Sequence, residues 1–159
     1  MVEEPQDIAV IGGSTNSSDH GGIFDIRENI GFLLGRAYRY VTWVCGKEFA
    51  PYGITSAQFI VLMHLDGYKS ESQRCLSQIT GIDRTTIVGI VDRLERKGLV
   101  IRTKVSEDRR VHRDVLTAYG LEIKNHLRIA AERVCSRLTA KISPEEYAEL
   151  VRLLTRLRE

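Results

Sequence analysis

The sequence predicts a mainly α-helical protein with one small β-hairpin. Apolar residues recur at the three- and four-residue spacing of amphipathic helices in six segments. After the fourth of these segments, two short runs rich in Val, Ile and Leu flank a polar turn. The chain has 159 residues, of which 43% are hydrophobic and 28% are charged, and this suits one globular domain with an appended element.

The first 22 residues differ in composition from the rest of the chain. They are rich in Gly and Ser, so residues 1–22 are expected to form a flexible tail that buries too little apolar surface to offset its ordering entropy. The first helix is expected from about residue 26 to residue 48, with Asp25 as its N-cap. Pro51 and Gly53 then break the helical pattern.

Two shorter helices are predicted next. Thr55 opens the first of them, with Gln58 at the position of a capping box, and Gly67 is expected to end it. The second covers roughly residues 73–80 and ends at Gly81.

The fourth predicted helix covers residues 84–97 and has one apolar face. Asp83 is its N-cap and Gly98 its C-terminal stop. The apolar face consists of Ile87, Ile90, Val91 and Leu94. The residues that lie off this face are Arg84, Thr85, Thr86, Val88, Gly89 and Arg93.

The hairpin and two further helices complete the predicted order of elements. Residues 99–104 and 111–116 read as the two strands, joined by a polar turn. Thr117 is expected to cap a long fifth helix that ends near residue 139. Ser143, followed directly by Pro144, predicts the start of a sixth helix that runs to the end of the chain.

The order of these elements predicts a winged helix-turn-helix over residues 55–116. A short helix, a tight connection and a second helix with a polar outer face describe a helix-turn-helix, and the hairpin is the wing. The flanking residues 23–54 and 117–159 are expected to form a helical dimerisation region, because the leucines near the chain end need to be covered. Such a homodimer would bind a palindromic operator in double-stranded DNA.

Charge is concentrated in the same region. Residues 69–113 hold eleven basic and six acidic side chains, in a chain whose formal net charge is only +2. A basic middle in an otherwise acidic chain is typical of a surface that binds phosphate, although charge runs are more often simply solvated.

Candidate DNA-contacting residues come from the fourth helix and from the tip of the wing. On the helix, hydroxyls and guanidinium groups can bond base edges or phosphates, and Gly89 allows close approach of the backbone. At the wing tip, arginines suit a narrow minor groove, and Asp108 would orient one of them. The alternatives are that the two threonines only cap the helix and that the tip is a solvated turn. The full set is Arg84, Thr85, Thr86, Val88, Gly89, Arg93, Asp108, Arg109 and Arg110.

Four motifs in this order resemble the MarR family of bacterial transcriptional regulators. They are residues 76–83, residues 90–100 with Gly-Leu-Val at their end, Asp108-Arg109-Arg110, and Leu116-Thr117-x-x-Gly120. The resemblance covers the chain from about Ile30 onward. It implies an obligate homodimer, usually a repressor, and many members of the family release DNA when a small molecule binds between the dimer and DNA-binding regions. It also implies that Asp108 and Arg110 form the family's wing Asp-x-Arg, with Arg110 in the minor groove.

A second face of the first helix suggests an effector site. Arginines beside aromatic rings suit an anionic aromatic ligand, such as an aromatic acid or its thioester, because the rings stack and a guanidinium pairs with the carboxylate. Ordinary core packing with solvated arginines is an equally good interpretation. The candidate residues are Arg36, Arg39, Tyr40, Trp43, Phe59, Met63 and His64.

Other function classes are disfavoured. The sequence has no phosphate-binding glycine loop, no GxSxG motif and no tight spacing of metal ligands, so neither an enzyme nor a bound cofactor or metal is expected. The family's peroxide sensors carry a cysteine where this chain has Gly31, and buried, inert thiols are expected at Cys45, Cys75 and Cys135. Three widely spaced cysteines and no apolar span predict a cytoplasmic protein. A winged-helix protein-interaction module and a redox-responsive regulator remain the alternatives.

Overall fold

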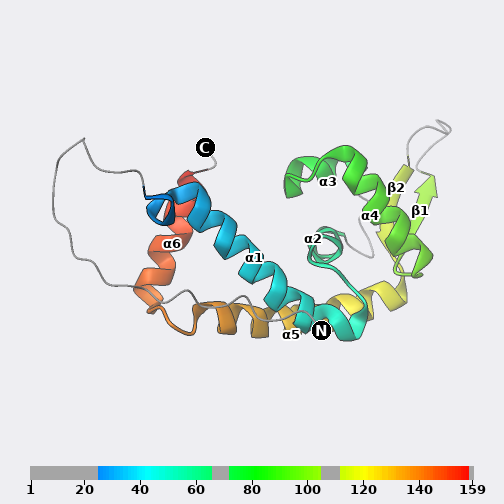
Figure 1. Ribbon diagram of the computed structural model, residues 1–159. Helices are drawn as coiled ribbons and strands as arrows, with labels where there is room; N and C mark the ends of the chain where they lie inside the picture. Colours follow the sequence, from blue (N-terminus) through cyan, green and yellow to red (C-terminus); the bar gives the residue numbers. More distant parts are fainter. Residues whose placement is uncertain (1–24, 66–71, 105–111, 158–159) are drawn as a thin grey trace. The chain divides into compact units, whose positions relative to one another are not determined.

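The computed structural model describes residues 25–65, 72–104 and 112–157 (Figure 1). The chain divides into two compact units, one ending at Trp43 and the other beginning at Val44. The predicted tail, residues 1–22, and the predicted wing tip, residues 106–109 with Arg110, lie outside the described residues.

The first unit contains a short 3-10 helix and most of helix α1 (Ile30–Phe49). The prediction of one helix from residue 26 is wrong at its start, because Asn29 has extended backbone and separates α1 from the 3-10 helix Ile26–Glu28. The Asn29 side chain accepts a hydrogen bond from the backbone amide of Phe32 at 3.2 Å. An asparagine that bonds the nearby backbone in this way competes with helix continuation. Asp25 therefore caps the 3-10 helix and not α1.

The second unit begins with the last turn of α1 and continues through a turn into α2 (Ser56–His64). The predicted capping box is present: the Thr55 hydroxyl accepts from the amide of Gln58, and the Gln58 side chain accepts from the amide of Thr55. Gly53 before it has a left-handed backbone with φ of 62°, which glycine adopts without strain. The helix ends at His64, earlier than Gly67, which lies outside the described residues.

Helices α3 (Gln73–Thr80) and α4 (Arg84–Arg96) form the predicted helix-turn-helix. The turn passes through Gly81, again with left-handed backbone. Asp83 caps α4 by accepting from the amide of Thr86 at 2.9 Å. The predicted apolar face of α4 is confirmed, since the buried residues of this helix are Ile87, Ile90, Val91 and Leu94.

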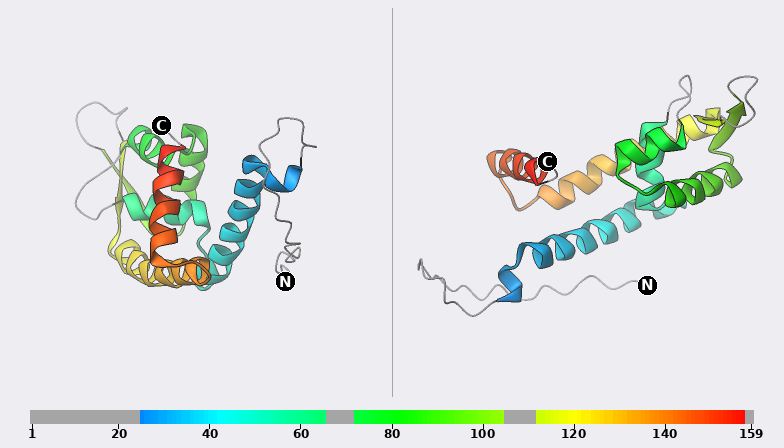
Figure 2. Two further views of the ribbon diagram at one scale, coloured as in Figure 1. Left: turned by 90° about the vertical axis from the view of Figure 1, so that its left-hand side faces the viewer. Right: turned by 90° about the horizontal axis from the view of Figure 1, so that it is seen from above.

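The wing is the two-stranded antiparallel sheet of β1 (Val100–Lys104) and β2 (His112–Leu116). Helices α5 (Ala118–Thr139) and α6 (Pro144–Arg156) follow. Figures 1 and 2 show α2, α3 and α4 grouped beside the hairpin, with α5 leading away from it. Helix α2 packs against both α4 and α5, so the apolar sides of these helices form the core of the second unit. Its largest fully buried side chains include Phe49, Leu62, Leu65, Leu76, Ile87, Leu94 and Leu127.

The Leu-Thr-x-x-Gly motif forms the joint between α4, the wing and α5. The Thr117 hydroxyl donates to the Gly98 carbonyl at 2.7 Å and accepts from the amide of Gly120 at 2.9 Å. The amide of Thr117 donates to the Leu99 carbonyl at 3.1 Å. A Cβ at Gly120 would overlap that carbonyl oxygen, so the close approach of α5 to Leu99 requires glycine.

Helix α6 has no buried residue and an apolar face that is open in the single chain. Its capping box at Ser143 and Glu146 is present as predicted. The exposed apolar residues near this end of the chain are Tyr147, Leu150, Val151, Leu153, Leu154 and Leu157. Over the described ranges, every helix is too short or too polar to cross a membrane.

Candidate DNA-binding face and basic cavity

The outer face of α4 carries the residues predicted to contact DNA. The side chains of Arg84, Thr85, Thr86, Val88 and Arg93 are all exposed, and Gly89 is half-buried. Because the opposite face of the helix is buried in the core, these residues are held on a rigid element. The structure thus brings six of the nine predicted DNA-contacting residues onto one helix.

The two threonines differ in what their hydroxyls do. Thr86 donates to the Asp83 carboxylate at 2.6 Å, and this bond is the main reason that the pKa of Asp83 lies below its usual value. Thr86 is therefore part of the helix cap, as the alternative interpretation of it expected, and its oxygen retains acceptor capacity. Among the described residues, the Thr85 hydroxyl has no hydrogen-bond partner, so it is free to bond a base or a phosphate.

Gly89 leaves an opening in the surface of α4. A Cβ placed there would meet only the Arg93 guanidinium, at 3.8 Å, which is an ordinary contact. The fold therefore does not require glycine at this position. That the α4 backbone approaches a DNA duplex closely at Gly89 remains a prediction.

An ion-pair cluster fixes the base of the wing against α4. Arg102 on β1 pairs with Asp92 on α4, and its Nε lies 3.7 Å from Glu95 and 3.8 Å from Asp114 on β2. Asp114 is fully buried, and burial is the main cause that raises the pKa of its carboxyl, against the opposing charge of Arg102. The cluster couples the position of the wing strands to that of α4.

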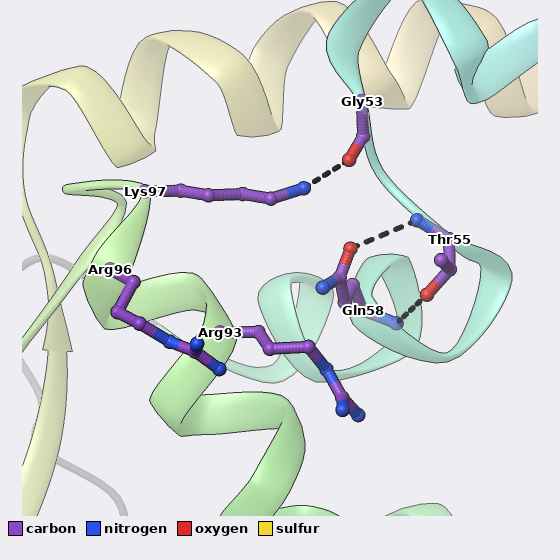
Figure 3. Close-up of a pocket in the computed structure, with 6 residues that line it drawn as sticks. All are labelled: Gly53, Thr55, Gln58, Arg93, Arg96 and Lys97. Carbon is purple, nitrogen blue, oxygen red and sulfur yellow. Dashed lines mark hydrogen bonds between the residues drawn. The ribbon is translucent and has the colours of Figure 1, made fainter.

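The end of α4 lines a cavity of about 330 Å³ that sequence reasoning missed (Figure 3). Three cations lie around it, although most of the surface that lines it is carbon from their side-chain stems and neighbours. The lining comes from α4, from the turn before α2 and from the start of α2. The sequence signal was the group of three cations at the end of α4, but nothing in the sequence places the start of α2 beside them. The lining residues are Gly53, Thr55, Gln58, Arg93, Arg96 and Lys97.

The predicted effector residues belong to two sets. The first set lies on α1 in the first unit, where Arg39 and Tyr40 are exposed and Arg36 and Trp43 are half-buried. The rings of Tyr40 and Trp43 stack, with 6.0 Å between their centroids. In the second unit, Phe59 stacks on Phe49 at 4.6 Å, so part of its surface serves the core. On the same helix, Met63 is half-buried and His64 is exposed. That the seven residues share one pocket remains a prediction.

The cysteines only partly follow expectation. Cys45 is buried, and burial raises the pKa of its thiol, so this cysteine fits an inert core residue. Cys75 is half-buried. The expectation of a buried thiol is wrong for Cys135, whose side chain is exposed on α5, because its position falls just off the buried stripe of that helix. Within the described part of the chain, no group of His, Cys, Asp and Glu side chains is suited to hold a metal ion.

The helix-turn-helix, the polar outer face of α4 and the attached wing define a winged helix-turn-helix protein of the DNA-binding class. Comparison with known proteins agrees with this class. The model of the MarR family matches residues 52–111. The repressor NicR of Pseudomonas putida is 28% identical over 134 residues, which are 84% of this chain and 85% of NicR. Over these residues the chain is similar to the MarR family of transcriptional regulators.

Two solved structures extend the similarity beyond the DNA-binding region. The first is BpsR of Bordetella bronchiseptica, whose DNA binding is regulated by 6-hydroxynicotinic acid. It is 27% identical to this chain with a TM-score of 0.81, and the match covers 87% of this chain and 99% of the BpsR chain. CouR of Rhodococcus jostii RHA1, solved with bound p-coumaroyl-CoA, has 28% identity and a TM-score of 0.71 over 82% of this chain and 92% of its own.

Proposed function

We propose that this protein is a homodimeric, cytoplasmic repressor that binds a palindromic operator and releases it when an aromatic acid, or the thioester of one, binds. The observation that carries the proposal is the outer face of α4, where exposed hydroxyl and guanidinium groups lie on a helix whose other face is locked into the core. A helix of this kind fits the major groove, where its first residues reach base edges.

The wing supplies the second contact with DNA. The Arg102 cluster holds the strands against α4, so the described strands of the wing and the helix would approach the duplex together. Asp108, Arg109 and Arg110 lie at that tip by sequence. We assign Arg110 to the minor groove, where the narrow, negatively charged channel favours a guanidinium group.

The apolar face of α6 supports a dimer. Leu150, Leu153 and Leu154 are each more than two-fifths exposed in the single chain, and they recur at the spacing of one helix face. Surfaces of this kind in soluble proteins mark interaction sites. A second copy of the chain covers this face in our proposal and sets the spacing of the two recognition helices at one turn of DNA, about 34 Å.

The effector class rests on α1 and on the relatives. BpsR responds to an aromatic acid and CouR binds an aromatic thioester. On α1 of this chain, stacked Tyr40 and Trp43 rings share the helix with Arg36 and Arg39, which offers both a stacking surface and a partner for a carboxylate.

Release of DNA by a ligand tests this function. A duplex selected from a random library by the wild-type protein would be titrated with 6-hydroxynicotinic acid and with p-coumaroyl-CoA, with fluorescence anisotropy as the readout. We expect one of the two compounds to release the duplex from the wild type. Arg36→Ala and Arg39→Ala should weaken the response by about tenfold or more, the usual effect of losing one charged hydrogen bond.

Arg128→Ala is the matched control, because Arg128 is an exposed arginine on α5 whose partner is the neighbouring Glu132. It should respond like the wild type. If both α1 variants also respond like the wild type, the assignment of the effector to this face of α1 is wrong.

A further inference from the structure

We propose that the basic cavity between the end of α4 and the start of α2 is a phosphate-binding site. Its three basic side chains, Arg93, Arg96 and Lys97, come from consecutive turns at the end of one helix, and no carboxylate is among the residues that line it. A cavity with this lining selects an anion, and phosphate groups match the several N–H donors that two guanidinium groups offer.

Figure 3 shows the three cations beside the cavity, and two of them, Arg96 and Lys97, are hydrogen-bonded to backbone carbonyls. The Lys97 ammonium donates to the carbonyl oxygen of Gly53 across the opening. The Arg96 Nε donates to the Asp92 carbonyl at 3.2 Å, which leaves the terminal nitrogens of its guanidinium group available. Arg93 forms no ion pair with any described residue. Among the described residues, none of these three cations forms an ion pair.

Gln58 is the second observation that indicates a ligand. Its side chain is only 3% exposed, yet it lines the cavity. Its Oε1 accepts from the amide of Thr55 at 3.0 Å, and its Nε2 has no partner among the described residues. Figure 3 shows this nitrogen turned away from Thr55, toward the side of the cavity that α4 forms. The Nε2 group opens onto the cavity, so its N–H donors are available to an anionic oxygen bound there.

The start of α2 adds a favourable field. Thr55, its N-cap, lines the cavity, so the positive end of the helix dipole lies beside it. The cavity volume falls at the lower end of the range found for small-molecule sites. The phosphate can come from two sources, a small phosphorylated molecule or the backbone of the operator. The chemistry that binds it is the same in both cases.

Isothermal titration of the full-length protein with inorganic phosphate and with pyrophosphate, at constant ionic strength and without DNA, tests the site. The sharpest variant is Gln58→Glu, since glutamate is an ordinary capping-box residue that still accepts from Thr55 but replaces the Nε2 donor with a carboxylate oxygen. Arg96→Gln is the second variant, because it removes an exposed charge without touching the core. Arg128→Gln, on α5, is the control.

We expect saturable binding of pyrophosphate by the wild type and by Arg128→Gln, and at least about tenfold weaker binding by Gln58→Glu and Arg96→Gln. The melting temperature of each variant shows whether it is folded. Absence of saturable binding by the wild type, or equal affinity in all four proteins, would overturn the proposal.

A second titration distinguishes the source of the phosphate. It adds pyrophosphate to the complex with the selected duplex, and it rests on the proposed function, whereas the first titration does not. If pyrophosphate displaces the duplex and Gln58→Glu weakens duplex binding, the site holds an operator phosphate. If duplex binding is unchanged in Gln58→Glu while pyrophosphate binding is lost, the site is for a small phosphorylated ligand. Either result supports the phosphate site.

Discussion

Arg102 on β1 lies directly opposite Asp114 on β2, and its Nε is 3.8 Å from the Oδ1 of that fully buried carboxylate. The same guanidinium group pairs with Asp92 on α4. One side chain thus connects both strands of the wing to the helix that is predicted to read DNA. Neither oxygen of Asp114 has a close hydrogen-bond partner among the described residues, so the charge of Arg102 is the main compensation, with a smaller contribution from the Gln73 side chain.

Asp114→Asn should make folding stability less dependent on pH in the acidic range. Burial raises the pKa of Asp114 above 3.8, and the neighbouring Asp92 and Glu95 act in the same direction. The folded chain therefore holds this proton more tightly than the unfolded chain does. The protonated Asp114 therefore adds to the free energy of unfolding at pH values below 3.8. This contribution is lost as the pH rises through the raised pKa that Asp114 has in the folded chain. Urea unfolding of both proteins across this range measures the difference.

Asparagine keeps the shape of Asp114 and removes its charge, so we also expect the variant to be at least as stable as the wild type at pH 7. A stability profile with the same slope in both proteins would show that Asp114 is not the titrating group.

Gly89→Ala should separate folding from DNA binding. Alanine fits at this position, and replacing a glycine within a helix stabilises it by up to about 1 kcal/mol. The added methyl group would obstruct close approach of a duplex, so operator affinity should fall by several-fold or more. Gly46→Ala in α1 is the matched control, since a Cβ there meets nothing within 4 Å. It should stabilise the protein without this loss, and an unchanged affinity in Gly89→Ala would show that α4 does not approach DNA at this residue.

Gly120→Ala should destabilise the folded protein by about 1–3 kcal/mol, the usual cost of forcing a methyl group into packed structure. The cause is the overlap of the new Cβ with the Leu99 carbonyl, which must move away from the start of α5. Thermal unfolding measures this effect against Gly46→Ala. A melting temperature at or above that of the wild type would mean that α5 and Leu99 are not in this contact.

Replacing Leu150 and Leu154 together with Glu should convert the dimer into a folded monomer. Both residues are exposed in the single chain, so their replacement leaves the core intact while placing charge on the apolar face of α6. Sedimentation velocity gives the oligomeric state and circular dichroism the helix content. Arg156→Glu, on the polar side of the same helix, should remain dimeric. A double variant that is still a dimer would place the interface elsewhere.

The elements that the sequence predicted well are those fixed by local chemistry. Thr55 with Gln58, Asp83, Thr117 and Ser143 each cap the helix that they were expected to cap, because a side-chain acceptor followed by free amides is a short-range signal. The buried stripe of α4 was predictable for the same reason, since its spacing alone identifies the inner face.

The features that were missed depend on residues far apart in the sequence. Asp114 reads as a polar residue in an edge strand, and only the packing of the hairpin against α4 makes it buried. The basic cavity needs Gln58 and Arg96 to come from different helices. Asn29 was missed for a local reason, because its side-chain bond to the amide of Phe32 competes with a helix pattern that continues on both sides of it.

The most direct test of sequence-specific binding through α4 compares two proteins, the wild type and an Arg84→Ala, Thr85→Ala double variant. The affinity of each protein is measured for the selected duplex and for a shuffled duplex, at physiological salt. The wild type should prefer the selected duplex by about a thousandfold or more. The double variant should lose about 1–3 kcal/mol of that preference for each base contact removed, while its affinity for the shuffled duplex changes far less. Equal affinity of the wild type for both duplexes, or an unchanged preference in the variant, would contradict sequence-specific binding through α4.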